Sequence, residues 1–455
     1  MPESLPSAPS VPSPRRPAHA LDRAFLGMER RHPDVRWDAG GVAYLSGPPP
    51  SLADLRAYVG FRLPELPLLT SRIEGGPRRP RWRTDADFAV DRHVHEVVAD
   101  GPGEWDTALH TALNAPFAPG AYWGVWLLHG HAPDRYAVCY RFHHACQDGS
   151  AAAMTFRAML GEGEPSARPV PGRGRWAGLP RRAGLAVGLA TKFASGPLVV
   201  RGPRPALPFV PTGERRLWRG RVPASALRSI GAARGGSAHD VHLAALAGAL
   251  AAWSERAGVP LPRVTALVPV DARRPEEDQT WGNRCFALPL ELPVRTDPRT
   301  APRTAPRTAP RTDPEDTDAP QDGAAPPLWR LERVMASTRK LRGEAWRQAI
   351  QDMVRFMPGR PTAWYLRRVL SPRVTHVMAT SMPLADKGSL GDTQVTGTAL
   401  LPLLVPGHLF GVGLSFFDSW AEVSFVADRA LPLGESLPGL WERAVAELAE
   451  TPAPG

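Results

Sequence analysis

The chain has 455 residues, 43% of them hydrophobic, which is enough for a large core and two or three domains. Its net charge is +10, but no nucleic-acid reading module or interleaved aromatic stripe accompanies the charge, so we expect no nucleic-acid partner. Three cysteines without paired spacing argue against a disulfide scaffold and favour a reducing, cytoplasmic setting.

The beginning of the chain is rich in proline and serine. Residues 1–18 contain no apolar core of the kind that secretory signals have, and we predict a disordered tail. The longest apolar stretch, roughly 399–417, contains Pro402, Pro406 and Gly407. It therefore predicts two strands rather than a membrane-spanning helix, and a soluble or peripheral protein rather than an integral one.

The most informative segment has the spacing HHxxxDG. An apolar, aromatic run over 136–142 predicts a buried strand, and the alanine-rich run over 150–160 predicts a helix. Between them lie His143, His144, Asp148 and Gly149. An imidazole where a strand ends, followed by a buried carboxylate that shapes the turn, suits general-base catalysis. The alternative is that the histidine pair is structural, as lone His-His pairs usually are.

A basic segment follows. Residues 165–213 contain eight Arg or Lys residues and no Asp or Glu. We interpret it as a Pro/Gly-rich linker between two halves of the chain, 19–164 and 214–451. Two alternatives stay open: a peripheral contact with a membrane or lipid surface, and a cradle for the phosphates of a ligand such as CoA.

The second half alternates helices and strands, so we predict mixed α/β architecture. The helices are expected at 240–253, with His239 and Asp240 as the N-cap, and at 329–347 and 439–450; strands are expected at 264–270, 285–292, 374–380, 410–417 and 420–426. An insertion at 295–327 begins with five tetrads of the Arg-Thr-Ala-Pro type. Proline at every fourth residue excludes a helix or a central strand, and we predict a disordered loop.

These segments resemble the CoA-dependent acyltransferase superfamily, which includes chloramphenicol acetyltransferases and nonribosomal peptide condensation domains. The chain looks most like the bacterial wax ester synthase/diacylglycerol acyltransferase family. Besides the HHxxxDG motif, the resemblance is carried by Leu21–Glu29 as an opening strand and turn, Gly47–Leu52 and Leu66–Leu69 as a first helix and strand, Phe117–Trp123, Val268–Arg274, Gly282–Arg284 and Val426–Arg429.

The resemblance implies two chloramphenicol-acetyltransferase-like α/β halves with the active-site channel between them. It implies that His144 takes the proton from an acceptor hydroxyl or amine that attacks acyl-CoA, with no acyl-enzyme and no further cofactor. His143 would pack behind the base. We expect Asp148 to pair with a buried arginine, Arg284 being one candidate, and Gly149 to complete the turn.

The oxyanion of the tetrahedral intermediate needs hydrogen-bond donors. Candidates are Asn283, protonated His144 and Ser381. Asn283 could instead be a turn residue, and Ser381 a cap at the end of a strand. Trp123 is assigned to substrate binding because it stands where the family has an apolar dipeptide followed by Trp.

Other reactive side chains are assigned no chemistry. Cys146 lies at a variable position of the motif, so a nucleophilic role is disfavoured. His93 and His95 share one face of a strand, but nothing else completes a metal site, and we expect none.

The sequence departs from the family pattern at three places: Ala121–Trp123, His239-Asp240 in place of Asn-Asp, and Thr380–Ala385 in place of Ser/Thr-Asn-Val-Pro-Gly-Pro. In the family these positions flank the channel, so the departures bear on substrate choice. We expect acyl transfer to a long-chain alcohol or diacylglycerol. The alternatives are an enzyme that tailors a specialised metabolite through a hydroxyl or amine, and a non-catalytic member of the fold. The cytoplasmic setting leaves membrane association open.

Overall fold

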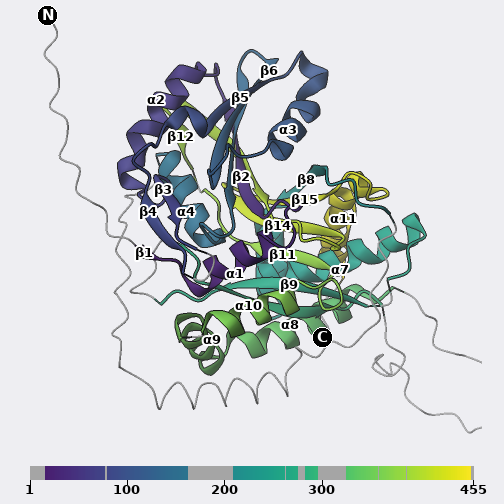
Figure 1. Ribbon diagram of the computed structural model, residues 1–455. Coiled ribbons are helices and arrows are strands. Elements are labelled where there is room, and N and C mark those ends of the chain that lie inside the picture. The colour runs from purple at the N-terminus through teal and green to yellow at the C-terminus, as the bar shows by residue number, and fades with distance from the viewer. Residues whose placement is uncertain are drawn as a thin grey trace, which may run out of the picture.

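The computed structural model describes residues 16–76, 79–161, 209–261, 263–274, 282–295, 324–356, 358–385 and 387–451. These residues form two lobes, each built on a six-stranded sheet (Figure 1). The predicted tail, basic linker and repeat insertion lie largely outside the described residues.

The sheet of the first lobe has the strand order β12-β13-β2-β7-β6-β5. Neighbouring strands are antiparallel except β5 and β6, which are parallel. The strands are β2 (Asp38–Ser46), β5 (Val94–Val98), β6 (Trp123–Ala132), β7 (Arg135–His143), β12 (Ser389–Leu390) and β13 (Thr393–Leu401). A small antiparallel sheet beside it contains β1 (Arg16–Pro17), β4 (Arg81–Thr84) and β3 (Ser71–Glu74).

The sheet of the second lobe has the order β10-β9-β11-β14-β15-β8. Strand β11 runs parallel to both of its neighbours, and the other pairs are antiparallel. The strands are β8 (Arg215–Pro223), β9 (Val264–Asp271), β10 (Cys285–Leu292), β11 (Val377–Ser381), β14 (Phe410–Phe417) and β15 (Trp420–Asp428).

The two lobes are interlocked, which the division into 19–164 and 214–451 did not anticipate. Residues Ser389–Leu401 leave the second half and add β12 and β13 to the first sheet, where β13 pairs with β2. The local sequence of a strand encodes its exposure pattern but not the identity of its neighbour, so this crossing was not predictable.

The helices cover both sheets (Figure 1). They are α1 (Ala20–Glu29), α2 (Leu52–Arg62), α3 (Trp105–Asn114), α4 (Gly149–Met159), α6 (Ala224–Ala232), α7 (Ala238–Ala257), α8 (Pro327–Arg342), α9 (Glu344–Phe356), α10 (Gly359–Val369) and α11 (Leu437–Glu450), with short 3-10 turns at Leu63–Glu65, Val90–Arg92, Pro102–Glu104 and Gly434–Ser436. No helix among the described residues combines the length and apolar character needed to cross a bilayer.

Several predicted elements are confirmed. The strand before the motif is β7, and the helix after it is α4. The apolar stretch near 399–417 contains the end of β13 and all of β14, two strands as predicted.

Four local predictions are wrong. The strand expected at Leu66–Leu69 is a turn that precedes β3. The segment Leu21–Glu29 is helix α1 rather than a strand and turn, because Leu21, Phe25 and Met28 recur at helical spacing and bury one face. The N-cap of α7 is Ser237 rather than His239, and Asp240 closes the capping box from the third helical position. The single basic helix expected over 329–347 is divided, because extended backbone at Gly343 ends α8.

A cluster of buried apolar side chains lies where the lobes meet. It joins α1, α9 and α10 to β9–β11 and includes Ala145 of the motif loop, Phe25 of α1 and Leu267 of β9. The motif loop is therefore held by packing from both halves of the chain.

Candidate active site

The motif loop is fixed at both ends by regular structure. Strand β7 ends at His143, and α4 begins at Gly149 with Asp148 as its N-cap. Between them the backbone N–H of His144 donates to the carbonyl of Trp37 (2.8 Å). The imidazole of His144 stacks on the ring of Phe25, with centroids 4.2 Å apart and planes 19° apart. Packing and backbone pairing together fix the direction of this side chain.

Two cavities meet at His144. The larger, about 140 Å³, extends along Gly40 and Gly41 of β2, the start of α4 and the end of β11. The smaller, about 60 Å³, lies beneath α1, α9 and α10 and has mostly apolar walls, including Phe25 and Leu366. His144 lines both cavities, so groups bound in either one can reach the same imidazole.

His144 is suited to accept a proton. Its Nδ1 is buried, and its ring lines both cavities. Burial lowers the pKa of His144 from its ordinary value, although its own carbonyl, Asp148 and Asn283 act in the opposite direction. The ring is therefore neutral at neutral pH, the state that a general base requires.

His143 points away from both cavities. Its Nδ1 accepts the backbone N–H of Ala145 (3.1 Å), and its Nε2 lies 3.7 Å from a carboxylate oxygen of Glu29. The ring meets Tyr122 edge-on, and burial lowers the pKa of His143 to about 4. This placement agrees with the expectation that His143 packs behind the base.

Asp148 links the two lobes at this site. Its carboxylate, fully buried, accepts two 3.0 Å bonds from the guanidinium of Arg273, which follows β9. It also accepts the backbone N–H groups of Ala151 (2.9 Å) and Arg284 (2.6 Å). Burial alone would raise the pKa of Asp148, but Arg273 and these hydrogen bonds outweigh burial and hold the pKa below its usual value.

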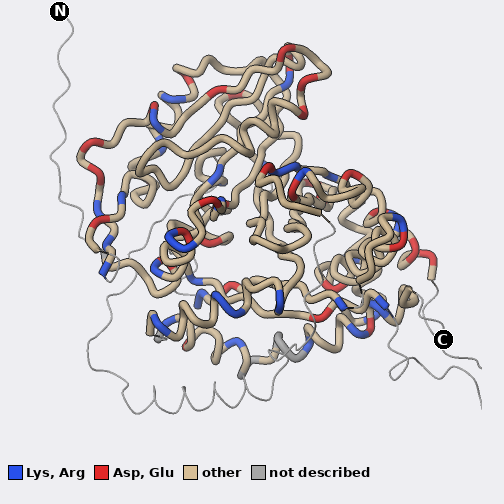
Figure 2. Tube along the Cα trace, turned by 45° about the vertical axis from the view of Figure 1, so that its right-hand side comes forward, with Lys and Arg blue, Asp and Glu red and all other residues tan. Residues whose placement is uncertain are grey.

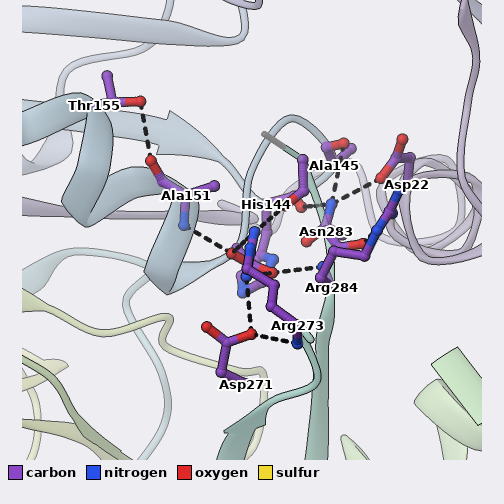
Figure 3. Close-up of polar contacts among 11 residues, drawn as sticks. Asp22, His144, Ala145, Ala151, Thr155, Asp271, Arg273, Asn283 and Arg284 are labelled. Carbon is purple, nitrogen blue, oxygen red and sulfur yellow. Dashed lines mark hydrogen bonds and ion pairs between the residues drawn. The ribbon is translucent and has the colours of Figure 1, made fainter. Parts of the chain in front are cut away.

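The buried arginine expected for Asp148 is Arg273, and the candidate Arg284 is wrong. Arg284 contributes its backbone N–H, while one of its side-chain nitrogens donates to the carbonyl of Asn283 (2.9 Å). Arg273 is also held by Asp271 (3.1 Å) and the carbonyl of Gly282 (2.9 Å) (Figure 3). Both arginines lie in segments that resemble the family, but their positions in the sequence do not show which guanidinium reaches the carboxylate.

Asn283 supports the motif loop from the second lobe. Its amide nitrogen donates to Asp22 of α1 (2.9 Å) and to the carbonyls of His144 (2.9 Å) and Ala145 (3.3 Å) (Figure 3). Asp22 also accepts the indole N–H of Trp82 (3.1 Å). Because these bonds use the amide hydrogens of Asn283, the structure does not offer them to a substrate oxyanion.

Ser381 and Gly149 both line the larger cavity. Ser381 is the last residue of β11, and its hydroxyl has no hydrogen-bond partner among the described residues. A Cβ on Gly149 would overlap the end of the Met382 side chain. Glycine at this position therefore lets the segment after β11 close over the start of α4.

Trp123 lies in the core of the first lobe. Its indole N–H donates to the carbonyl of Leu69 (2.7 Å), and its ring stacks on His93. It is 2% exposed and lines neither cavity, so the structure gives it a packing position rather than the substrate contact that the resemblance implied. His93 itself contacts the carbonyl of Trp123 (3.1 Å), and no group of three metal-ligating side chains occurs among the described residues.

Asp22, Phe25 and Arg273 were not assigned to the site from the sequence. Asp22 and Phe25 lie in the segment Leu21–Glu29, and Arg273 lies in the segment Val268–Arg274, both of which resemble the family. The signal was therefore present, but only the three-dimensional arrangement shows that these residues converge on His144 and Asp148.

Comparison with known proteins shows which families and folds the chain is similar to. Residues 19–207 match the family model described as the wax ester synthase/diacylglycerol acyltransferase catalytic domain. A protein of Mycobacterium tuberculosis named as a diacylglycerol O-acyltransferase is 27% identical over 244 residues, covering 50% of this chain and 53% of that protein, about half its length. A second protein of that name and organism is 26% identical over 399 residues, covering 77% and 74%.

Solved structures share the fold. The wax ester synthase/diacylglycerol acyltransferase from Marinobacter aquaeolei superposes with a TM-score of 0.62 at 18% identity, covering 95% of this chain and 98% of that one. The starter condensation domain of rhizomide synthetase, solved in complex with C8-CoA, gives 0.61 at 14% identity, covering 96% and 94%. These matches confirm the predicted fold class of two α/β halves of the chloramphenicol-acetyltransferase type.

Proposed function

We propose that the chain, which is similar to the wax ester synthase/diacylglycerol acyltransferase family over residues 19–207, transfers an acyl group from acyl-CoA to the hydroxyl of a long-chain alcohol or diacylglycerol. The observation that carries the proposal is the position of His144, a neutral imidazole at the junction of two cavities. Acyl-CoA enters as a substrate, and the proposal needs no further cofactor.

In the proposed reaction, Nε2 of His144 accepts the proton of the acceptor hydroxyl while its oxygen attacks the thioester carbonyl. The tetrahedral intermediate collapses by breaking the C–S bond. The departing thiolate of CoA then takes the proton from the imidazolium, which restores neutral His144. Binding both substrates beside one base supplies the proximity that the direct transfer requires.

A direct transfer is favoured because the cysteines near the site make poor nucleophiles. Cys146 is buried in the core of the first lobe. Cys285 lines both cavities, but burial raises the pKa of its thiol well above the ordinary value, so the thiolate is scarce at neutral pH.

We assign stabilisation of the oxyanion to Ser381 rather than Asn283. The Ser381 hydroxyl faces the larger cavity without a partner among the described residues, whereas the amide hydrogens of Asn283 are already donated. The imidazolium of His144 would be the second donor once the proton has moved. Asp148 and Gly149 shape the loop that presents the base, and His143 packs behind it.

The smaller cavity suits an alkyl chain because its walls are mostly apolar. Leu21 and Phe25 of α1, Met353 of α9 and Leu366 of α10 contribute side chains to it. An apolar chain placed there would gain roughly 0.8 kcal/mol for each methylene that it buries. Such a cavity favours a lipid substrate over a small polar one.

A second candidate is acyl transfer to a hydroxyl or amine of a specialised metabolite. It is favoured by Ser381-Met382-Pro383, which stands at the cavity wall where the family pattern has Asn-Val-Pro. The intact His144 and the satisfied Asp148–Arg273 pair argue against a member of the fold that has lost catalysis.

The test is incubation of the purified protein with acyl-CoA and a panel of long-chain alcohols, diacylglycerol and amines, with release of free CoA and product mass as the readouts. The proposal expects CoA release that depends on a hydroxyl acceptor, with the ester as product. A reaction without acceptor reports simple hydrolysis of the thioester. Turnover only with amines would support the second candidate, and no turnover with any acceptor would contradict both.

A further inference from the structure

Helix α10 has two chemically different faces. Its inner face, with Thr362, Tyr365, Leu366 and Val369, is buried and lines the smaller cavity. Its outer face consists of Arg360, Trp364, Arg367 and Arg368; Trp364 lies about one turn from each of the three arginines, and all four residues are exposed. The indole of Trp364 is 61% exposed, an unusual position for the largest apolar side chain.

The outer face of α10 carries positive charge with no compensating acid. From residue 353 to residue 385 the sequence has five arginines and no Asp or Glu. The nearest acid on α9, Asp352, is already paired with Arg274 (2.7 Å). Within the described part of the chain, no ion pair involves Arg360, Arg367 or Arg368.

The surroundings extend the same charge. Helix α1 packs against α10 and places the guanidinium of Arg23 beside Gly359, where α10 begins. Figure 2 shows basic positions recurring along the helices at the lower edge of the molecule, where α8–α10 lie in Figure 1. A surface of this kind attracts anions and is steered toward them before contact.

We propose that the outer face of α10 binds the surface of an anionic lipid membrane, with the helix lying parallel to it. The arginines would meet lipid phosphates, and Trp364 would enter the headgroup region, where an indole finds both water and hydrocarbon. Basic amphipathic helices use this combination at membrane interfaces. The proposal places the contact on a described helix, separate from the basic segment at 165–213.

A lipid surface explains the exposed indole, whereas the phosphates of a nucleotide would not. The four side chains are exposed and line neither of the two cavities that meet at His144. Because the opposite face of α10 lines the smaller cavity, docking would bring that cavity close to the membrane. The value of this proximity rests on the proposed function, but the binding itself does not.

Co-sedimentation of the full-length protein with vesicles tests the proposal. Vesicles of phosphatidylcholine with phosphatidylglycerol are compared with vesicles of phosphatidylcholine alone, and no substrate is present. We expect binding only to the anionic vesicles, with loss at high salt because the attraction is screened. The double variant Arg367→Gln/Arg368→Gln should weaken binding roughly 30-fold, from the typical contribution of each basic residue near a charged membrane. Trp364→Ala should weaken it at unchanged net charge.

Matched controls separate this face from the net charge of the chain. Arg256→Gln/Arg443→Gln removes two exposed charges elsewhere, and Phe61→Ala removes a strongly exposed aromatic side chain on α2. We expect both controls to bind like the parent. Equal losses in the controls, or no loss in the α10 variants, would overturn the proposal. An increase in KM for acyl-CoA with unchanged vesicle binding would also overturn it, by assigning the arginines to CoA. The vesicle-binding outcomes do not depend on whether acyl transfer itself is detected.

Discussion

The two sides of the motif loop differ: the back is the buried side that contacts Arg273 and Asn283, and the front is the side that faces the larger cavity. Behind the loop, Asp148, Asn283 and Asp22 are fully buried and hydrogen-bonded, and the bonds from Arg273 to Asp148 and from Asn283 to Asp22 and His144 join the two halves of the chain. In front, the larger cavity is lined mostly by apolar residues and glycines, and its polar side chains include Ser150, Asp271, Thr380 and Ser381. The position of the base is therefore set by a dense buried network, while the choice of substrate is left to a mostly apolar wall.

We therefore expect substitutions behind the loop to lower the stability of the fold, and substitutions in the cavity wall to lower the reaction rate. Breaking a buried, hydrogen-bonded charge pair costs stability, because the remaining partner keeps its charge without compensation. Removing a hydroxyl from a cavity wall leaves the fold intact and changes only the reaction. The predictions below use this contrast.

The largest effect is expected at the back. Arg273→Met leaves the carboxylate of Asp148 buried without its guanidinium, and the free energy of unfolding should fall by about 3–5 kcal/mol. Chemical denaturation measures this loss. Arg274→Met, which removes a half-exposed neighbouring cation, is the control and should cost about 1 kcal/mol or less. Equal stability of the two variants would mean that the Asp148–Arg273 pair does not join the lobes.

At the front, Ser381→Ala should lower kcat roughly 10- to 100-fold, because one donor to the oxyanion is lost. Its melting temperature should stay that of the parent, since the hydroxyl has no partner to lose among the described residues. Steady-state kinetics with the best acceptor of the panel measures the effect. Thr380→Val, which removes the neighbouring hydroxyl, serves as the comparison; an equal loss in both would remove the special role of Ser381.

Lowering the pH should reduce activity before it reduces the stability of the fold. The lowered pKa of His144 predicts that kcat/KM falls with pH only below about 6.5, as the base becomes protonated. The pKa of Asp148 is lower in the folded state than its ordinary value of 3.8, so its ion pair stabilises the fold above that pH and is lost as pH falls through the folded pKa. Activity should therefore fall about tenfold per pH unit while the fold is still intact. Parallel loss of activity and structure would contradict the separation.

The smallest effect is expected from deletion of Thr300–Pro314. The described flanks of the insertion already meet, since Arg295 and Ala324 form an antiparallel bridge, so a shorter loop needs no movement of the core. The change in closure entropy is well below 1 kcal/mol. Melting temperature and specific activity should match the parent, and protection of the segment in hydrogen exchange would show instead that it docks.

Local sequence was sufficient for the motif loop, because every feature that shapes it is close in the chain. The apolar run of β7, the cap at Asp148 and the alanine-rich α4 were all predicted, and His144 lies where a base is needed. Helix α1 was not predicted, although its buried residues Leu21, Phe25 and Met28 recur at helical spacing.

Contacts between distant segments were beyond local reasoning. In the sequence, Arg273 and Arg284 are equally plausible partners of Asp148. In the structure, the guanidinium of Arg273 and the backbone N–H of Arg284 both reach the carboxylate, because β9 and β10 are neighbouring strands. Asn283 was assigned to the oxyanion by its residue type, but the same amide donors satisfy Asp22 and the loop carbonyls. The insertion of β13 into the first sheet is of the same kind, since it depends on the choice of a neighbour.

The central claim is that the buried network holds the loop while His144 alone carries out the proton transfer. His144→Gln tests it most directly, because glutamine keeps much of the bulk against Phe25 but cannot serve as a base. Denaturation curves and single-turnover rates would be measured on the same preparation. We expect a loss of about 100- to 10,000-fold in the rate with a melting temperature close to that of the parent. Retention of more than about a tenth of the rate would contradict the assignment of His144 as the base.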